Sequence, residues 1–338
     1  MKKYNVAILG ATGAVGQEML KVLIERNFPL NEIKLLASAR SAGKTIKFAD
    51  KDYTIEEACE DSFKGMDIVL GAATNETAIK FSKAIIASNA VFIDNSSAFR
   101  MDDECPLVVP EVNSQDCKNH KGIIANPNCA TIIALTAINV LDEYANINRM
   151  IVSTYQAVSG AGVGGIYELD NQVAAISKNE DVNCDTFAYQ IAYNLIPQIG
   201  GFDDMGYSSE EMKMQNEGRK ILHKPELKVN CTCIRVPVYR SHSESITLEF
   251  DKEISVEKAR ELLANAKGVK LVDDLDNQQY PMPLDTTDQD LIYVGRIRKD
   301  ISNDKNGLVL WCCGDQVRKG AATNAIQIGE SLIEQGLI

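Results

Sequence analysis

Two segments of the sequence carry residue types that could perform covalent chemistry, NPNCAT and RVPVYRSHSES. Cys129 in the first segment precedes the apolar run IIALTAINVL, which predicts a helix beginning at or next to the thiol. The N–H groups and the dipole at a helix start favour a thiolate, the form that attacks carbonyl carbons, and could also hold an oxyanion. A buried core cysteine would fit the same pattern, so a reactive role requires a partner.

Three histidines are available as that partner. His120 lies in a polar run and His223 lies just before a proline, so both are expected in exposed turns. His242 lies among strand residues in the second half of the chain, with a serine on each side and arginines before it. A buried structural histidine is the alternative for each of them. A helix-start thiol in a chain whose first third has the pattern of a nucleotide-binding fold favours His242 as its partner.

The first third of the chain alternates short strand-like runs with helical stretches. Its strand-like runs are YNVAILG, EIKLLAS, MDIVLGAA and AVFIDN, and NETAIKFSKAIIASN suits a helix packed on a sheet. This alternation predicts an α/β fold with a parallel, doubly wound sheet. After about residue 145 longer strands are expected, followed at the end of the chain by GLVLWCC and one terminal helix.

The turn GATGAVG, from Gly10 to Gly16, follows the first strand and opens a helix. Glycines in such a turn allow the backbone to approach a pyrophosphate at the helix N-terminus, although a turn needed only for packing is the alternative. The second strand ends in LLASARSAGK, which has Arg40 and Ser41 but no acidic residue to bind the ribose hydroxyls of NAD. NADP is therefore favoured over NAD, with a solvated basic loop as the competing interpretation.

The spacing in the second half leaves one geometric question open. Arg235 and His242 are seven residues apart, so strict alternation would put them on opposite faces unless the chain bends near Pro237. Cys231 and Cys233 are two apart on one predicted strand, which favours buried packing on one face.

Composition excludes several classes of function. The chain has 338 residues, enough for two domains, and its net charge of −12 argues against nucleic-acid binding. Nine cysteines without the spacing of a disulfide framework or a zinc site predict free thiols in a reducing cytoplasm and no metal. The apolar stretch after the first lysines is too short for a signal peptide, and no run suits a membrane span.

Taken together, the motifs carry a family resemblance. The sequence resembles aspartate-β-semialdehyde dehydrogenases over nearly its whole length, in GATGAVG, ARSAG, NSSAFR, VVPEVN, NPNCAT, TYQAVSGAG, EEMKM, IRVPVYRSHS and RKGAATNA. The resemblance implies a Rossmann-type NADP-binding domain and an α+β catalytic and dimerisation domain like that of glyceraldehyde-3-phosphate dehydrogenase. The expected boundaries are 1–130, completed by the terminal helix 317–338, and 131–316.

The resemblance also implies a role for each matching position. Cys129 would be the nucleophile that forms an acyl-thioester, His242 the acid/base catalyst and Gln156 the residue that orients the substrate. Arg235 would clamp the substrate carboxylate and Glu210 would face its amine. The implied phosphate contacts are Arg100, Asn128 and Lys213, and the implied NADP contacts are Gly10, Thr12, Gly13, Ala14, Val15, Arg40, Ser41, Ser159, Gly160 and Gln316. The family commonly has asparagine where this chain has Gln316.

The implied reaction is the reversible, NADPH-dependent reductive dephosphorylation of L-4-aspartyl phosphate to L-aspartate 4-semialdehyde. It belongs to the biosynthesis of lysine and diaminopimelate, threonine and methionine, and a cytoplasmic homodimer or homotetramer is expected. N-acetyl-γ-glutamyl-phosphate reductase is the first alternative, but its cysteine is preceded by Pro-Gly. Glyceraldehyde-3-phosphate dehydrogenase shows Ser-Cys-Thr-Thr and prefers NAD. A non-catalytic NADP-binding sensor would have lost Cys129, His242 or Arg235, and all three are present.

Overall fold

The computed structural model describes residues 2–303 and 306–338. The chain forms two compact units, Met1–Asn128 with Gly320–Ile338, and Cys129–Lys319. Among the described residues, no helix combines the length and the apolar character needed to cross a membrane.

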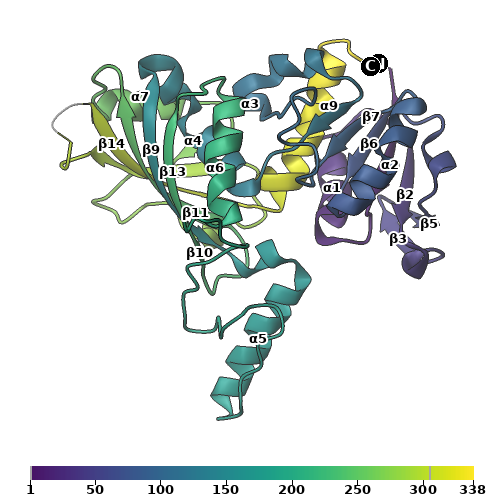
Figure 1. The fold of residues 1–338 in the computed structure, drawn as a ribbon, viewed down its shortest axis with the longest axis horizontal. Helices are drawn as coiled ribbons and strands as arrows, with labels where there is room; N and C mark the ends of the chain where they lie inside the picture. Colours follow the sequence, from purple (N-terminus) through teal and green to yellow (C-terminus); the bar gives the residue numbers. More distant parts are fainter. Residues whose placement is uncertain (1, 304–305) are drawn as a thin grey trace. The chain divides into compact units, whose positions relative to one another are not determined.

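The first unit is built on a six-stranded sheet in the order β5-β2-β1-β6-β7-β8, in which each neighbouring pair runs parallel (Figure 1). Its strands are β1 (Tyr4–Leu9), β2 (Leu30–Ala37), β5 (Glu56–Glu57), β6 (Ile68–Gly71), β7 (Val91–Asp94) and β8 (Ile123–Ala125), beside the small hairpin of β3 (Thr45–Phe48) and β4 (Lys51–Thr54). The four strand-like runs of the first third correspond to β1, β2, β6 and β7. The predicted parallel sheet is therefore confirmed.

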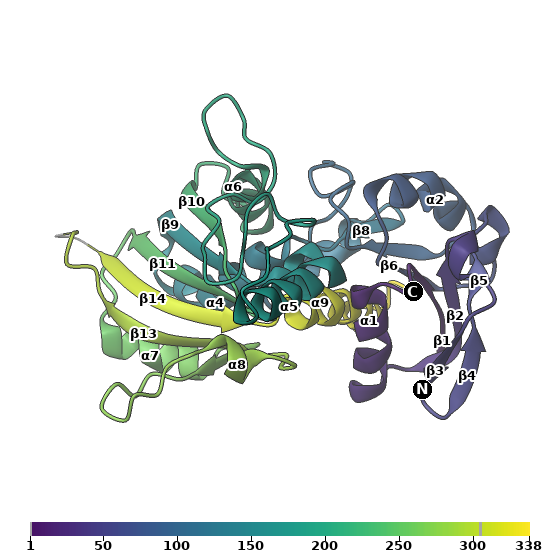
Figure 2. The same cartoon turned by 90° about the horizontal axis from the view of Figure 1, so that it is seen from below.

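Helices cover both faces of this sheet. The helices of the unit are α1 (Ala14–Glu25), α2 (Asn75–Ala87), α3 (Pro110–Asn113) and α9 (Asn324–Glu334), with short 3-10 turns at Ala39–Ser41, Glu60–Phe63 and Ser114–Asn119. One apolar core joins α1 and α9, which lie beside each other (Figure 2), to one face of the sheet. A second core packs α2 on the other face through Phe81 and Ile85. The terminal helix thus completes the first unit, and a π-helical turn at Arg318–Thr323 precedes it.

The second unit is built on a mixed six-stranded sheet in the order β10-β9-β11-β14-β13-β12. Its strands are β9 (Ile147–Gln156), β10 (Lys228–Arg235), β11 (His242–Phe250), β12 (Val269–Leu271), β13 (Ile292–Lys299) and β14 (Gly307–Gly314). Its helices are α4 (Cys129–Ala145), α5 (Val163–Ser177), α6 (Ser209–Ile221), α7 (Val256–Ala264) and α8 (Pro283–Thr286), with a 3-10 turn at Val158–Ala161. Helices α4 and α6 pack on each other and on the sheet, whereas α5 projects away from it (Figure 1).

The segment between β10 and β11 answers the geometric question raised by the sequence. Arg235 ends β10 and His242 begins β11, so the two residues belong to different strands. Six residues, 236 to 241, reverse the chain between them, and Ser241 has a backbone φ of 74°. Both side chains are consequently buried on the same face of the sheet, 6% and 0% exposed.

Candidate active site

Cys129 is the first residue of α4, as the sequence predicted. The helix is 17 residues long and every position from Ala130 to Ile138 is buried, so the half of the helix next to the thiol is fixed by its packing. Cys129 itself is partly exposed and is a free thiol. A thiol placed at the N-terminus of such a helix is reachable and lies at the positive end of the helix dipole, which favours its thiolate form.

His242 lies against this thiol. Its Nε2 is 3.5 Å from Cys129 Sγ, although the two residues are 113 positions apart in the chain. The main-chain N–H of Ala157 donates to His242 Nδ1 at 3.1 Å. Since Nδ1 accepts this hydrogen bond, the neutral ring carries its proton on Nε2, the nitrogen that faces the sulfur.

The imidazole is buried in surroundings that oppose a positive charge. Burial, and secondarily the guanidinium of Arg235, lowers the pKa of His242 to about 3, although the carboxylate of Glu210 acts in the opposite direction. The ring is therefore neutral at physiological pH and acts on the sulfur as a hydrogen-bond donor. The other histidines lie elsewhere in the fold: His223 is in an exposed turn, as expected, whereas His120 is half-buried and accepts from the Gly122 N–H.

Gln156 and Arg235 continue the row of side chains that Cys129 and His242 begin. Arg235 on β10 is paired in register with Gln156 on β9. The Gln156 Nε2 lies 3.3 Å from His242 Nε2 and donates to Glu210 Oε1 at 3.1 Å. Arg235 Nη1 donates to the carbonyl of Ala157 at 2.7 Å. A guanidinium, an amide and an imidazole are thus held side by side next to the thiol.

Helix α6 supplies an ion pair to this row. Its first turn is fixed by a capping box, in which Ser208 and Glu211 satisfy each other's backbone N–H groups. Lys213 Nζ lies 2.8 Å from Glu210 Oε2, and the Glu210 carboxylate is largely buried. Glu210 therefore connects the half-buried ammonium of Lys213 to Gln156.

The glycine-rich segment after β9 approaches the same row. A Cβ added to Gly160 would lie 2.7 Å from Arg235 Nη1 and 3.4 Å from His242 Cε1. Gln316, which follows β14, donates from Nε2 to Ser159 Oγ and accepts the Ser241 N–H at 2.8 Å. The second unit thus brings together seven of the predicted residues around Cys129, namely Gln156, Ser159, Gly160, Glu210, Lys213, Arg235 and His242. Gln316 is joined to this group through its hydrogen bond to Ser159.

The two remaining predicted phosphate ligands belong to the first unit. Arg100 is 8% exposed, and its Nη2 donates to the Asn95 carbonyl at 2.8 Å. The loop that carries Arg100 is organised by Asp94, which accepts from the N–H and hydroxyl of Ser96. Asn128 is buried and immediately precedes Cys129 in the chain.

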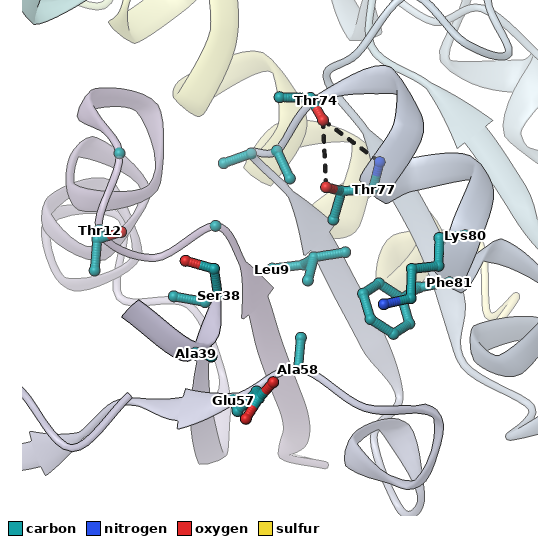
Figure 3. Close-up of a pocket in the computed structure, with 15 residues that line it drawn as sticks. Leu9, Thr12, Ser38, Ala39, Glu57, Ala58, Thr74, Thr77, Lys80 and Phe81 are labelled. Carbon is teal, nitrogen blue, oxygen red and sulfur yellow. Dashed lines mark hydrogen bonds between the residues drawn. The ribbon is translucent and has the colours of Figure 1, made fainter. Parts of the chain in front are cut away.

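The glycine turn borders a cavity in the first unit (Figure 3). The cavity has a volume of about 400 Å³, and Gly10, Thr12 and Gly13 line it together with Ser38. Gly10 has a φ of 99°, and a Cβ there would lie 2.4 Å from the Ala72 carbonyl oxygen, so the turn requires glycine. A cavity at the carboxyl ends of β1 and β2, bordered by a glycine turn, is where this kind of sheet binds a dinucleotide.

The other predicted cofactor residues of this unit lie next to the cavity in sequence rather than among its lining residues. Ala14 and Val15 open α1, and Arg40 and Ser41 form the 3-10 turn after β2. Arg40 is exposed and Ser41 is buried.

Several lining residues were missed by the sequence analysis. Glu57, Thr77 and Lys80 border the cavity (Figure 3), and Glu57 reaches it because β5 pairs with the end of β2. A two-residue strand has no recognisable pattern, so the sequence offers no signal for Glu57. Lys80 could have been found, since it lies one turn into the predicted helix that follows the third strand.

A parallel sheet with a glycine turn for a dinucleotide, together with a helix-start thiol in contact with a buried histidine, defines a nicotinamide-dependent dehydrogenase that uses a cysteine. The family described as "Semialdehyde dehydrogenase, NAD binding domain" matches residues 5–120, and "Semialdehyde dehydrogenase, dimerisation domain" matches residues 139–319. The chain belongs to the aspartate-semialdehyde dehydrogenase family.

Relatives with this name align over the full chain. The aspartate-semialdehyde dehydrogenase of Aquifex aeolicus is 50% identical and that of Bacillus subtilis is 47% identical, each over 99% of both chains. Among solved structures, aspartate semialdehyde dehydrogenase II from Vibrio cholerae has a TM-score of 0.96 and 44% identity, over 98% of this chain and 99% of that one. The same enzyme has also been solved in complex with ASA, with a TM-score of 0.96, 43% identity and 99% coverage of both chains.

Proposed function

We propose that the protein catalyses the reversible, NADPH-dependent reductive dephosphorylation of L-4-aspartyl phosphate to L-aspartate 4-semialdehyde. The observation that carries this proposal is the 3.5 Å contact between Cys129 Sγ and His242 Nε2, beside a buried arginine. Such a pair suits covalent catalysis on a small acyl group that also carries a carboxylate. The full-length identity to aspartate-semialdehyde dehydrogenases supports this substrate, and supports it over N-acetyl-γ-glutamyl phosphate.

Cys129 begins the reaction. Its thiolate attacks the carbonyl carbon of the acyl phosphate, the C–S bond forms, and the bond from carbon to the phosphate oxygen breaks. Inorganic phosphate leaves as the hydrogen phosphate dianion, so the proton that the thiol gave up balances the step. The helix-start N–H groups of α4 and the Nε2–H of His242 stabilise the negative charge on sulfur and on the developing oxyanion.

The nicotinamide cofactor, when bound, supplies the hydride that reduces the thioester. The thiohemiacetal anion on Cys129 then collapses, the C–S bond breaks, and the aldehyde and the thiolate are released. His242 moves protons at Nε2 in the acid/base role that the family resemblance assigns to it, and the Ala157 contact specifies this nitrogen as the reactive one. In the reverse direction the same groups take the aldehyde and phosphate to the acyl phosphate.

Three side chains are proposed to hold the aspartyl part of the substrate. The guanidinium of Arg235 gives two parallel hydrogen bonds to the carboxylate, which suits its planar fork. Glu210 faces the amine, and Gln156 orients the acyl group next to the thiol. These assignments are supported by the contacts of Gln156 to both Glu210 and His242.

The phosphate is proposed to bind Arg100, Lys213 and Asn128. Arginine and lysine are the side chains that hold phosphate oxygens by charge-assisted hydrogen bonds. The partial exposure of the Lys213 ammonium supports its access to a ligand.

NADP is proposed as the cofactor because Arg40 follows β2 at the position from which a cation reaches a 2′-phosphate. The pyrophosphate would bind the turn of Gly10, Thr12 and Gly13 at the start of α1, with Ala14, Val15 and Ser41 alongside. Ser159, Gly160 and Gln316 stay predicted cofactor contacts of the second unit.

A cytoplasmic homodimer or homotetramer that serves lysine, diaminopimelate, threonine and methionine biosynthesis completes the proposal. The dimerisation-domain match over residues 139–319 supports self-association through the second unit.

The direct test is phosphate-dependent reduction of NADP with L-aspartate 4-semialdehyde. The wild type should turn over, and Cys129→Ala should lose turnover while it still binds NADPH. Glyceraldehyde 3-phosphate and N-acetyl-L-glutamate 5-semialdehyde serve as comparison substrates under the same conditions. Turnover by Cys129→Ala, or a higher kcat/KM for either comparison substrate, contradicts the proposal.

A further inference from the structure

Gln316 ties together two segments that are far apart in the sequence. It lies two residues beyond the end of β14 and is 4% exposed. Its Oε1 accepts the main-chain N–H of Ser241 at 2.8 Å, and its Nε2 donates to the hydroxyl of Ser159. One side-chain amide therefore bridges the segment before β11 and the segment after β9.

Ser241 immediately precedes His242. The residue is fully buried, and its φ of 74° places its backbone in the left-handed region that L-residues rarely adopt. Such a conformation persists where the surroundings hold it, and the acceptor of its buried N–H is the Gln316 side chain. Loss of that acceptor would leave a buried donor unsatisfied beside the imidazole.

Ser159 immediately precedes Gly160, the residue that lies against Arg235 and His242. The absence of a side chain at Gly160 is what allows this approach, because a Cβ there would lie 2.7 Å from Arg235 Nη1, and it would also come into contact with His242 Cε1 at 3.4 Å. The main chain of the same segment is bonded to the β10–β11 connection, with the Ser159 N–H donating to the Tyr239 carbonyl at 3.2 Å. Ser241 therefore adjoins the residue that carries the imidazole, and Ser159 adjoins a residue that lies against it.

The main chain next to Gln316 is itself fixed by several contacts. Its neighbour Asp315 is fully buried and pairs with Arg240 Nε at 2.6 Å. The same carboxylate accepts the N–H groups of Asp288 at 2.8 Å and Val317 at 2.9 Å. Because the residue before it is fixed in this way, Gln316 can hold in place the two segments to which its side chain is hydrogen-bonded.

We propose that Gln316 is a positioning residue for the Cys129–His242 pair, acting through the Ser241 N–H and the Ser159 hydroxyl. The bridge sets the distance between His242 Nε2 and Cys129 Sγ before any cofactor is bound. This role is separate from the contact to NADP expected from the family resemblance. It deepens the proposed function, because the pair it positions is the one to which that function assigns the chemistry.

The test uses the reactivity of Cys129 in the protein without cofactor. Alkylation of Cys129 by iodoacetamide is followed by peptide mass spectrometry over a range of pH, in a background where the exposed Cys59 and Cys184 are replaced by serine. Gln316→Ala is expected to lower the alkylation rate at neutral pH by about tenfold and to move its pH profile upward, because a displaced Nε2–H no longer stabilises the thiolate. Ser159→Ala, which removes one of the two partners, is expected to shift the profile in the same direction by less.

Gln172→Ala is the matched control for the loss of a buried glutamine. Gln172 on α5 also accepts main-chain N–H groups, those of Ile191 and Ala192, but its contacts are with the segment that follows α5. Its alkylation profile should coincide with that of the wild type. Turnover assays at saturating NADPH should show kcat reduced at least about tenfold in Gln316→Ala.

An unchanged alkylation profile in Gln316→Ala overturns the proposal, whether or not the KM for NADPH rises. A profile shifted equally by Gln172→Ala also overturns it, because the shift would then report general loosening of the fold. The alkylation readout needs no substrate, so a wild type that fails to turn over L-aspartate 4-semialdehyde would refute the proposed function and leave this test intact.

Discussion

The main-chain N–H of Ala157 and the Nδ1 of His242 form a 3.1 Å hydrogen bond inside the second unit. A backbone N–H can only donate, so this contact fixes Nδ1 as an acceptor in a way that no side-chain rearrangement can reverse. The remaining ring proton is left on Nε2, directed at the sulfur of Cys129. The strand geometry that supplies the N–H therefore determines which nitrogen performs the chemistry.

The protonation state of His242 gives the first prediction. Burial and the charge of Arg235 keep the ring neutral, so its two nitrogens should stay distinct, Nδ1 without a proton and Nε2 with one, from about pH 8 down to about pH 5. Nitrogen NMR of protein labelled at the histidine rings measures this, and the signals of His120 and His223 are identified by replacing each. Two protonated nitrogens on His242 at pH 6 would contradict the prediction.

The second prediction concerns the choice of cofactor. Arg40→Ala should raise the KM for NADPH by about tenfold, because it removes the cation that pairs with the 2′-phosphate. The rise is no larger because water screens a pair formed by an exposed guanidinium. NADH lacks the 2′-phosphate and serves as the control cofactor in the same variant, where its KM should change little. Steady-state rates with both cofactors check this, and an equal loss for both would show that Arg40 contacts a shared part of the dinucleotide or supports the fold.

The sequence predicts the elements of the first unit well because their patterns are local. Buried parallel strands read as continuous apolar runs, and the glycine turn after β1 has its own spacing. The position of Cys129 at the start of α4 was predicted on the same grounds, by the apolar run that follows it. Cys231 and Cys233 were expected to be buried together on one strand face, and they are 3% and 1% exposed with sulfurs 3.7 Å apart.

The contacts around His242 could not be predicted, since they depend on register between distant strands. Alternation could not decide whether Arg235 and His242 share a face, because the reversal between β10 and β11 is set by the left-handed Ser241 rather than by strand periodicity. The Ala157 bond and the Gln316 bridge involve main-chain groups, which carry no residue-specific signal. Site chemistry was therefore assigned from the motifs, while its geometry required the fold.

The close approach of Gly160 gives the third prediction. Gly160→Ala should displace Arg235, because the new methyl group would lie 2.7 Å from Nη1, while Nη1 is held by the Ala157 carbonyl. The KM for the aldehyde should rise at least about tenfold, as expected for a clamp moved out of position. Gly218→Ala is the control, since a Cβ there meets nothing within 4 Å and lies in α6, where alanine favours the helix. Equal kinetics in the two variants would contradict the role given to Gly160.

Backbone strain at Ser241 gives the fourth prediction. Ser241→Gly should raise the free energy of unfolding by up to about 1 kcal/mol, since glycine adopts a positive φ without the steric cost of a Cβ and offsets that gain with its larger chain entropy. Ser241→Ala removes the same hydroxyl but keeps the Cβ, so it should bring no gain. Urea unfolding of both variants against the wild type checks this, and equal stabilisation by alanine would assign the effect to the hydroxyl instead.

Glu244 is a buried carboxyl group in the row of side chains next to the catalytic one. It is fully buried on β11, opposite Thr154 on β9 and Cys312 on β14, and its two oxygens have no hydrogen-bond partner among the described residues. Burial, and secondarily the nearby thiol of Cys233, raises the pKa of this carboxyl well above its ordinary value. The fold therefore keeps this carboxyl protonated. Glu244 lies two residues from His242 along β11, and its partner Thr154 lies two residues from Gln156 along β9.

The fifth prediction follows from this raised pKa. At a pH below the ordinary pKa of glutamate the carboxyl is neutral in both the folded and the unfolded chain, so it contributes no pH dependence. As pH rises, the unfolded chain loses this proton first and the folded chain retains it, so the contribution of Glu244 to stability falls. Glu244→Gln cannot ionise, and its free energy of unfolding should therefore fall less than that of the wild type between about pH 5 and pH 8. Glu244→Met replaces the unpaired buried carboxyl by an apolar side chain of similar shape. Its free energy of unfolding should therefore exceed that of the wild type by about 1–3 kcal/mol at the higher pH. Urea unfolding at both pH values checks this, and a wild type and Glu244→Gln that lose stability in parallel would show that Glu244 titrates normally.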